Sequence, residues 1–292
     1  MDFLADQFMQ RALVGGALLG FLNGFLGAFV VLRRLALMAD SLSHSMLPGL
    51  ALGVMWAGGL SVTALFVGGL FAALFVALGA TLIARSSRLK EDTALAILYT
   101  VAVSLGLVLL SLVKSRVSLN HYLFGNILGL DDADLWLAYG LTLLAIPLLA
   151  ALQRPYLLVL FEPQVARSQG LRVGALNLLL IVLLVLVMVA SVRAVGVILM
   201  LGLLIAPAAT IYLCSDSFPA MLWGGGIVGA LGSVAGLIVS YRLENLPSGA
   251  SIVLVLGAVF VLTWIFSPRY GVLRRWRKAR HYHEESLARW PR

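Results

Sequence analysis

Long apolar stretches constrain this chain more than any other feature of its sequence. A helix needs about 20 apolar residues to cross a bilayer, and its backbone polar groups must be satisfied internally. The stretches lack the two-residue alternation of barrel strands. The sequence therefore predicts an all-α polytopic bundle of eight or nine spans within residues 1–267, followed by a basic tail at 268–292. The candidate spans lie near 11–32, 36–57, 61–84, 93–113, 135–152, 173–192, 194–214, 219–240 and 250–267.

Composition excludes an ordinary soluble protein. Hydrophobic residues make up 61% of the chain and charged residues 12%, whereas soluble domains have about 45–50% and about 25%. Two candidate spans, 173–192 and 194–214, form a nearly continuous apolar run broken only by Arg193 and Gly196. One of these two segments could therefore be re-entrant rather than a full span. For this reason the predicted number of spans is eight or nine.

The basic residues predict an orientation in the membrane. With the N-terminus outside and the C-terminus in the cytoplasm, all but five of the 21 Lys and Arg lie inside, as the positive-inside rule expects. The formal charge of +8 thus needs no nucleic-acid partner. We expect a multi-pass protein of the cytoplasmic membrane whose tail lies on anionic lipid. The five exceptions are Arg11, Lys114, Arg116, Arg193 and Arg242.

Asp40 and His44 are the ionisable residues placed deep in an apolar stretch. Their four-residue spacing puts both side chains on one helix face. For a helix that begins near Leu35, a rise of about 1.5 Å per residue places His44 close to the bilayer midplane. Ionisable groups at that depth are costly and normally face a partner or a water-filled cavity. The pair is therefore a candidate metal site, although a purely structural hydrogen bond to a neighbouring helix is the competing interpretation.

Pro48 predicts a kink at this pair, because proline cannot donate to the carbonyl of His44 four residues earlier. A carboxylate, an imidazole and a freed carbonyl suit Mn²⁺, Fe²⁺ or Zn²⁺ better than Cu(I). One helix supplies too few ligands. A twofold dimer would bring two Asp and two His together.

Two further polar segments interrupt the apolar pattern. Residues 114–134, predicted to lie outside, contain His121, Asp131 and Asp134 and are either an outer gate that attracts cations or a solvated loop. Residues 162–170, predicted to lie inside, begin with Glu162-Pro163 and end at Gly170, which predicts a short helix. A soluble partner could grip this helix, but an idle surface loop fits the residues equally well.

Some chemistries are absent from the sequence. The chain has no Gly-x4-Gly-Lys-Ser/Thr phosphate loop, and its one cysteine, Cys214, permits neither a disulfide nor a thiolate cluster. No tightly bound cofactor and no enzyme activity are expected. An intramembrane metalloprotease is disfavoured because no Glu is placed at membrane depth to act as a general base.

Several motifs together resemble the membrane permeases of manganese, zinc and iron ABC importers, the ABC-3 group, over nearly the whole chain. The family usually has Asp-Pro-Glu where this chain has Glu162-Pro163-Gln164, and often Ala among the serines of the 40–44 motif. The motifs are FVVLRR (29–34), DSLSH (40–44), PG (48–49), RLKEDTA (88–94), LFGNIL (123–128), EPQVARSQG (162–170), AVGVIL (194–199), PAAT (207–210) and LPSGA (246–250).

The resemblance implies a bacterial inner-membrane permease that pairs with a second copy or a similar permease. It also implies two cytoplasmic ATP-binding subunits, an external metal-binding protein, and alternating access driven by ATP. On this basis Asp40 and His44 line the path of a divalent metal substrate, and 162–170 is the helix that couples to the ATPase. The coupling residues are Glu162, Pro163, Gln164, Ala166, Arg167 and Gly170.

One other class of function stays open. A proton-driven secondary cation transporter would also use an intramembrane Asp and His, but it would need neither an ATPase nor a docking helix. The identity of the metal is open as well, because a simple Asp/His site prefers Zn²⁺ when Zn²⁺ and Mn²⁺ are both present. We expect the external binding protein to make that selection.

Overall fold

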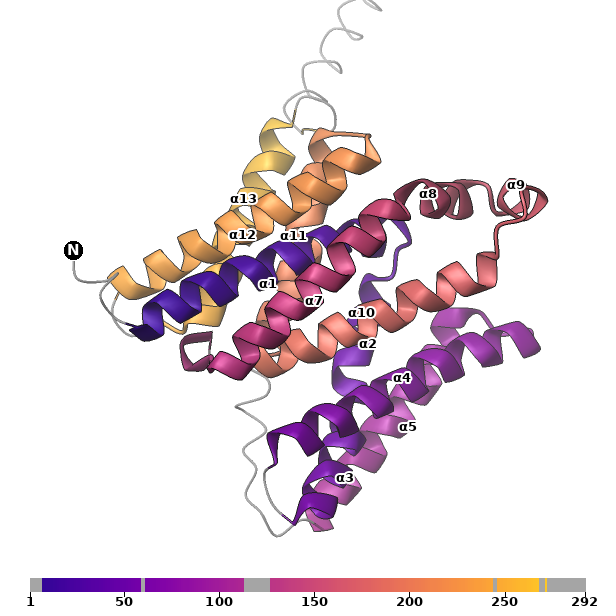
Figure 1. Ribbon diagram of the computed structural model, residues 1–292, viewed down its shortest axis with the longest axis horizontal. Helices are drawn as coiled ribbons and strands as arrows, with labels where there is room; N and C mark the ends of the chain where they lie inside the picture. Colours follow the sequence, from indigo (N-terminus) through magenta and orange to yellow (C-terminus); the bar gives the residue numbers. More distant parts are fainter. Residues whose placement is uncertain (1–6, 59–60, 113–126, 244–245, 268–270, 272–292) are drawn as a thin grey trace, which may run out of the picture.

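In the computed structural model, residues 7–58, 61–112, 127–243, 246–267 and Gly271 are described, and within that part every regular element is a helix (Figure 1). The long helices are α1 (Gln7–Leu32), α4 (Val62–Ser86), α5 (Glu91–Leu112), α7 (Asp132–Ala151), α10 (Val173–Val195), α11 (Val197–Cys214), α12 (Phe218–Arg242) and α13 (Ser248–Phe266). The short ones are α2 (Ala36–Ser45), α3 (Leu47–Ala57), η2 (Ile127–Gly129), α8 (Gln153–Phe161) and α9 (Pro163–Ser168).

Eight helices of the described part are long and apolar enough to cross a membrane, which confirms the predicted polytopic bundle. The candidate span 36–57 is not one continuous helix, and the kink predicted from Pro48 is a full break. That stretch is two helices of 10 and 11 residues that meet at Met46, and each is too short to span alone. The break follows from Pro48, which has no N–H for the carbonyl of His44, so that carbonyl accepts from the N–H of Met46 instead.

The apolar run 173–214 is resolved into two full-length helices. α10 has 23 residues and α11 has 18, and both are candidate spans, so neither is the short re-entrant segment that the sequence left open. Gly196 separates them with a φ of 83°. A residue with a Cβ rarely adopts this backbone conformation, so glycine is required at the turn.

Small residues bring α1 and α12 into backbone contact. A Cβ added at Gly24 would overlap the carbonyl oxygen of Gly225, and one at Gly20 would overlap that of Gly229. Residues at four-residue spacing form one ridge on each helix, and two such ridges allow helices to approach closely. These two small-residue ridges are therefore the packing surface between α1 and α12.

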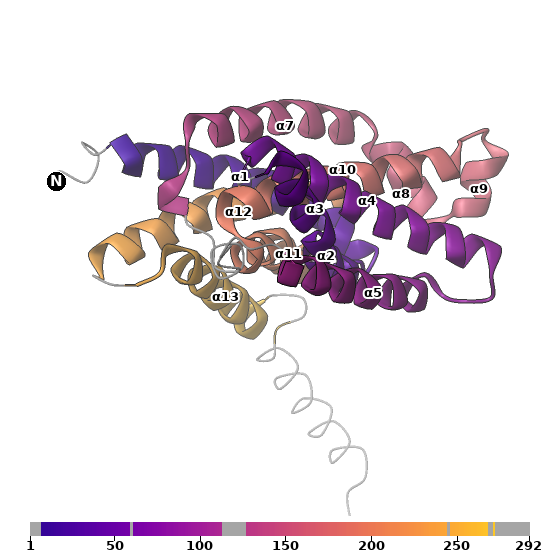
Figure 2. The ribbon, with the colours of Figure 1, turned by 90° about the horizontal axis from the view of Figure 1, so that it is seen from below.

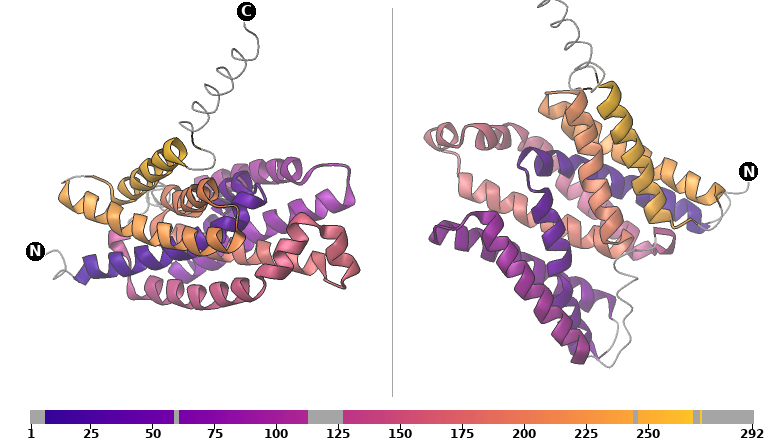
Figure 3. Two further views of the ribbon diagram at one scale, coloured as in Figure 1. Left: turned by 90° about the horizontal axis from the view of Figure 1, so that it is seen from above. Right: turned by 180° about the vertical axis from the view of Figure 1, so that it is seen from behind.

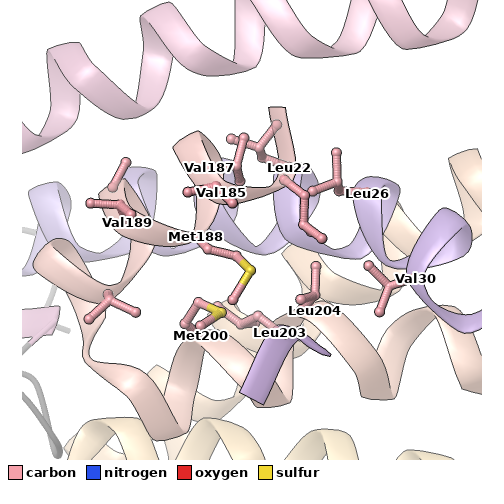
Figure 4. Packing of buried hydrophobic residues seen from close by; sticks show 14 of the residues in the cluster. Leu22, Leu26, Val30, Val185, Val187, Met188, Val189, Met200, Leu203 and Leu204 are labelled. Carbon is pink, nitrogen blue, oxygen red and sulfur yellow. The ribbon is translucent and has the colours of Figure 1, made fainter. Parts of the chain in front are cut away.

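The buried core lies where α10 and α11 pack on α1. Figure 4 shows Leu22 and Leu26 of α1 facing Met188 of α10 and Leu204 of α11. α2 joins the same core through Met38 and Leu42, which are 3% and 1% exposed. The α3, α4 and α5 helices form a hairpin-like unit against the other side of α2 (Figure 1).

The two ends of the bundle differ. α1 begins at one end, whereas α8 and α9 project at the opposite end, near the connection between α4 and α5 (Figures 1 and 2). Arg85 lies in the last turn of α4, and Arg88 and Lys90 lie in that connection, so two of the predicted inside segments, 85–90 and 162–170, lie at the same end of the structure (Figure 1).

Candidate functional site

α2 presents Asp40, Ser41 and His44 on the face that the other described helices leave open. Leu37, Asp40, Ser41 and His44 follow helical spacing and are all at least partly exposed, while Met38, Ala39, Leu42 and Ser43 are buried. The exposed fraction of Leu37 is 76%. In the view from behind, α2 runs between α5 and α11 (Figure 3). The predicted common face of Asp40 and His44 is therefore present.

The two ionisable side chains are close but not hydrogen-bonded to each other. Nε2 of His44 lies 3.9 Å from Oδ1 of Asp40, and the side chains are 32% and 54% exposed. This separation is too long for a hydrogen bond. Both groups thus keep lone pairs available for a third atom between or beside them, as two ligands of a metal ion would.

Two of the three serine hydroxyls near the pair are already used within α2. Ser43 donates to the carbonyl of Asp40 at 2.7 Å, and Ser45 donates to the carbonyl of Leu42 at 2.8 Å. Within the described residues there is no group of three or more His, Cys, Asp or Glu that could hold a metal ion. The site on one chain is therefore a pair of potential ligands on an open face.

Tyr99 is a neighbour of the pair that the sequence did not reveal. Its ring centroid lies 6.4 Å from that of His44, at an interplanar angle of 49°. It comes from α5, which packs along α2. The only signal in the sequence is a tyrosine in the middle of an apolar span, and nothing in that pattern indicates which helix it will face.

Residues 162–170 form the predicted short helix at the projecting end of the bundle. α9 begins at Pro163, directly after Glu162, and the chain turns at Gly170 with a φ of 80°. Ala166 is fully buried against Val159 and Val173, whereas Glu162, Pro163, Gln164, Arg167 and Gly170 are exposed. One apolar side chain therefore holds α9 to the bundle, and its polar residues remain free to contact another protein.

A polar network fixes the base of this projection. The guanidinium of Arg33, just after α1, donates to Oδ1 of Asn177 on α10, and the hydroxyl of Tyr156 on α8 donates to the carbonyl of Leu176 at 2.9 Å. Burial lowers the pKa of Arg33 and raises the pKa of Tyr156 to about 12. The network joins the end of α1 to the helices that carry α9.

The residues proposed for an outer gate make structural contacts where they are described. Asp131 caps α7: its side chain accepts from the backbone N–H of Asp134 at 2.8 Å, and chiefly this bond lowers the pKa of Asp131. The carboxylate of Asp134 pairs with Arg193 of α10 at 2.9 Å. His121 lies outside the described residues, so it is not placed relative to the two acids.

An all-helical bundle with eight candidate membrane spans in its described part is the fold of a polytopic membrane protein. The chain belongs to the ABC 3 transport family, whose profile matches residues 5–267, and it is thus a multi-pass permease of an ABC importer. This confirms the family resemblance drawn from the sequence motifs.

Relatives and a solved structure match nearly the whole length. The manganese transport system membrane protein MntC of Halalkalibacterium halodurans is 37% identical over 286 residues, covering 98% of this chain and 96% of the relative. The manganese import system permease protein ScaB of Streptococcus parasanguinis is 37% identical over 263 residues, covering 90% and 92%. The structure of PsaBC from Streptococcus pneumoniae in complex with Fab has a TM-score of 0.80 at 34% identity, covering 94% of this chain and 96% of that one.

Proposed function

We propose that this chain is the membrane permease of a manganese importer, with Asp40 and His44 on the path of the ion. The open face of α2 is the observation that carries the proposal, because an acid and an imidazole inside an apolar segment are costly unless they serve an ion or a partner. One carboxylate oxygen and one imidazole nitrogen suit Mn²⁺, with Zn²⁺ and Fe²⁺ as chemically similar cargo.

Manganese is the first choice of cargo because relatives that match nearly the whole chain are named as manganese transport proteins. The ligand types do not select Mn²⁺ over Zn²⁺, since Zn²⁺ binds such donors more tightly. Selection is therefore assigned to an external binding protein that delivers the ion to the permease.

Two copies of the permease complete the site. Each chain offers two ligands on a face that its own helices leave open. A twofold axis beside α2 would bring two Asp40 and two His44 side chains around one ion. A similar second permease with the same pair would serve equally well. The ion is a transported substrate rather than a resident cofactor. A site shared between two permease chains can open to either side of the membrane when the chains move apart.

ATP hydrolysis is assigned to two separate cytoplasmic subunits that grip α9. The exposed residues Glu162, Pro163, Gln164, Arg167 and Gly170 form the contact, and the buried Ala166 anchors it. Movement of α9 is transmitted through α8 and the Arg33–Asn177 bond to α1 and α10. The bundle then alternates between outward-facing and inward-facing states around the ion site. Because the ATPase subunits are cytoplasmic, α9 lies on the cytoplasmic side of the membrane. In this orientation the N-terminus is outside and the C-terminus is inside.

The test is ATP-dependent uptake of ⁵⁴Mn²⁺ into vesicles that contain the permease, its ATPase and its binding protein. Asp40→Asn and His44→Gln are each expected to reduce uptake at least about tenfold, because each removes one of few ligands. The matched control is Asp92→Asn, which removes an exposed acid at the start of α5. Its uptake is expected to equal that of the wild type.

Normal uptake in both α2 variants would make the pair structural and overturn the proposed path. Uptake that continues without ATP and follows a proton gradient would favour a secondary transporter instead. Competition by Zn²⁺ and Fe²⁺ in the same vesicles measures which ion the assembly prefers.

A second experiment tests the contact with the ATPase. Arg167→Glu is expected to release the ATPase from the purified assembly, because it reverses an exposed charge on α9. The control, Arg154→Glu, reverses an exposed charge on α8 outside 162–170. Equal retention of the ATPase by both variants would show that α9 is not the coupling helix.

A further inference from the structure

A groove between α4 and α10 is lined almost entirely by apolar side chains. It has a volume of about 410 Å³ and is open to the surroundings of the bundle. One charged residue lines it, at the end where α4 stops. The lining consists of Phe75, Leu78, Gly79, Thr81, Leu82, Arg85, Leu178 and Ile181.

Arg85 lies at one end of the groove, and its positive charge is not paired with an acid of the described residues. Its guanidinium reaches across to the first turn of α10, where a Cβ added at Gly174 would lie 3.8 Å from Nη1. Arg85 is exposed and forms no hydrogen bond or ion pair with any other described residue. A positive charge thus stands free at the mouth of an apolar channel.

One acid lies beside the groove without pairing with Arg85. Glu91 accepts a hydrogen bond from Thr81 at 2.7 Å, and its charge also acts on Arg33. Among the described residues the guanidinium of Arg85 therefore stays unpaired.

The length of the groove matches one leaflet of a bilayer. Phe75 and Arg85 are ten residues apart on α4, which is about 15 Å along a helix. This is half of a hydrocarbon core of about 30 Å. With Arg85 at the membrane surface on the side of α9, the apolar walls of the groove reach the bilayer midplane. The groove therefore has a length suited to an acyl chain. The guanidinium at its mouth supplies the positive charge that a phosphate group requires.

We propose that this groove binds one anionic phospholipid of the leaflet on the side of α9, with an acyl chain between α4 and α10 and the head group on Arg85. Bound there, the lipid would bridge α4 of the α3–α5 unit and α10 of the main core.

A second groove of the molecule provides an internal comparison. It lies between α3 and α4, has a volume of about 480 Å³, and is lined by residues such as Leu52, Trp56 and Phe71. Among the described residues that line it, none carries a charge. Ordinary membrane lipid can cover such a surface, but nothing in it selects an anionic head group.

The test is native mass spectrometry of the full-length protein after exchange into detergent with phosphatidylglycerol or with phosphatidylcholine of the same chains. The wild type is expected to retain one phosphatidylglycerol, about fivefold in preference to phosphatidylcholine. Arg85→Gln is expected to abolish the preference, and Arg88→Gln, which removes an exposed charge three residues further on, is expected to keep it.

The apolar part is tested by filling each groove. Leu178 and Leu52 are 48% and 53% exposed, so a tryptophan at either position adds volume outside the core. Leu178→Trp is expected to lose the retained lipid, and Leu52→Trp to keep it. Elution as a single species in gel filtration checks that each variant is folded.

Three outcomes would overturn the proposal. They are equal retention of the two lipids by the wild type, an unchanged preference in Arg85→Gln, and retained lipid in Leu178→Trp. If the third outcome comes with a change in the oligomeric state of Leu178→Trp, the groove is assigned to a second copy of the chain. The measurement does not involve transport, so its result does not depend on whether Asp40 and His44 lie on the ion path.

Discussion

Arg193 and Asp134 join the end of α10 to the start of α7, with Nη2 of the arginine 2.9 Å from Oδ1 of the aspartate. Their side chains are 21% and 12% exposed. Arg193 lies in the last turn of its helix and Asp134 in the first turn of its own, so each charge also complements a helix dipole. The pair stabilises the outer end of the bundle in the predicted orientation.

Removing the cation of this pair leaves a largely buried acid unpaired. We expect Arg193→Gln to reduce the free energy of unfolding by about 2 kcal/mol. The control is Arg11→Gln: Arg11 pairs with Asp132 at 3.0 Å, but these side chains are 33% and 68% exposed. That substitution should cost less than about 1 kcal/mol. Denaturant unfolding in detergent measures both, and equal losses would contradict the assignment.

Substitutions of Asp131 distinguish two roles for this residue, as the N-cap of α7 or as part of an outer gate. As a cap it accepts one backbone N–H of α7, and asparagine can accept the same bond. We expect Asp131→Ala to reduce stability by about 1 kcal/mol and Asp131→Asn to change stability little. Metal uptake by Asp131→Asn then reports on charge alone. Loss of uptake in this stable variant would favour the outer gate.

The contact of α1 with α12 depends on the absence of side chains. We expect Gly24→Ala to destabilise the protein by about 1–3 kcal/mol, because its Cβ would meet the backbone of Gly225, which cannot rotate away. The control is Gly140→Ala in α7, where a Cβ would meet no atom within 4 Å. That change should be neutral or stabilising through helix propensity. Thermal unfolding in detergent measures both, and equal midpoints would refute the close contact.

The local features of the candidate site could be read from the sequence. The spacing of Asp40 and His44 predicts a shared face, Pro48 predicts the break after His44, and Glu162-Pro163 with Gly170 predicts α9. Each of these depends on backbone hydrogen bonding within a few residues. Such effects are the same wherever the segment lies in the fold.

The errors and omissions have a common physical origin. Apolar content over 36–57 suggested one span, because hydropathy counts side chains and does not register a helix that ends within the run. The approach of Tyr99 to His44 and the bond from Arg33 to Asn177 join residues far apart in sequence. They depend on how helices pack against one another, and an amphipathic pattern cannot give this for helices that are apolar on all sides.

Tyr156 ties α8 to α10, and its ionisation provides the last prediction. The hydroxyl donates to the carbonyl of Leu176, and burial raises the pKa of Tyr156 to about 12. An unfolded tyrosine titrates near pH 10. Because the folded pKa is the higher one, the stabilisation is complete below about pH 10 and is lost as the pH rises towards about 12.

We therefore expect the melting temperature of the wild type to fall between about pH 10 and 12 by more than that of Tyr156→Phe, which has no proton to lose. At neutral pH the same variant should be less stable by about 1 kcal/mol, because the carbonyl of Leu176 loses its donor. Tyr139→Phe is the control, since Tyr139 is 51% exposed on α7. If both variants show the alkaline profile of the wild type, the hydroxyl of Tyr156 contributes nothing to the attachment of α8. If only Tyr156→Phe flattens the profile, this bond holds α8 to α10.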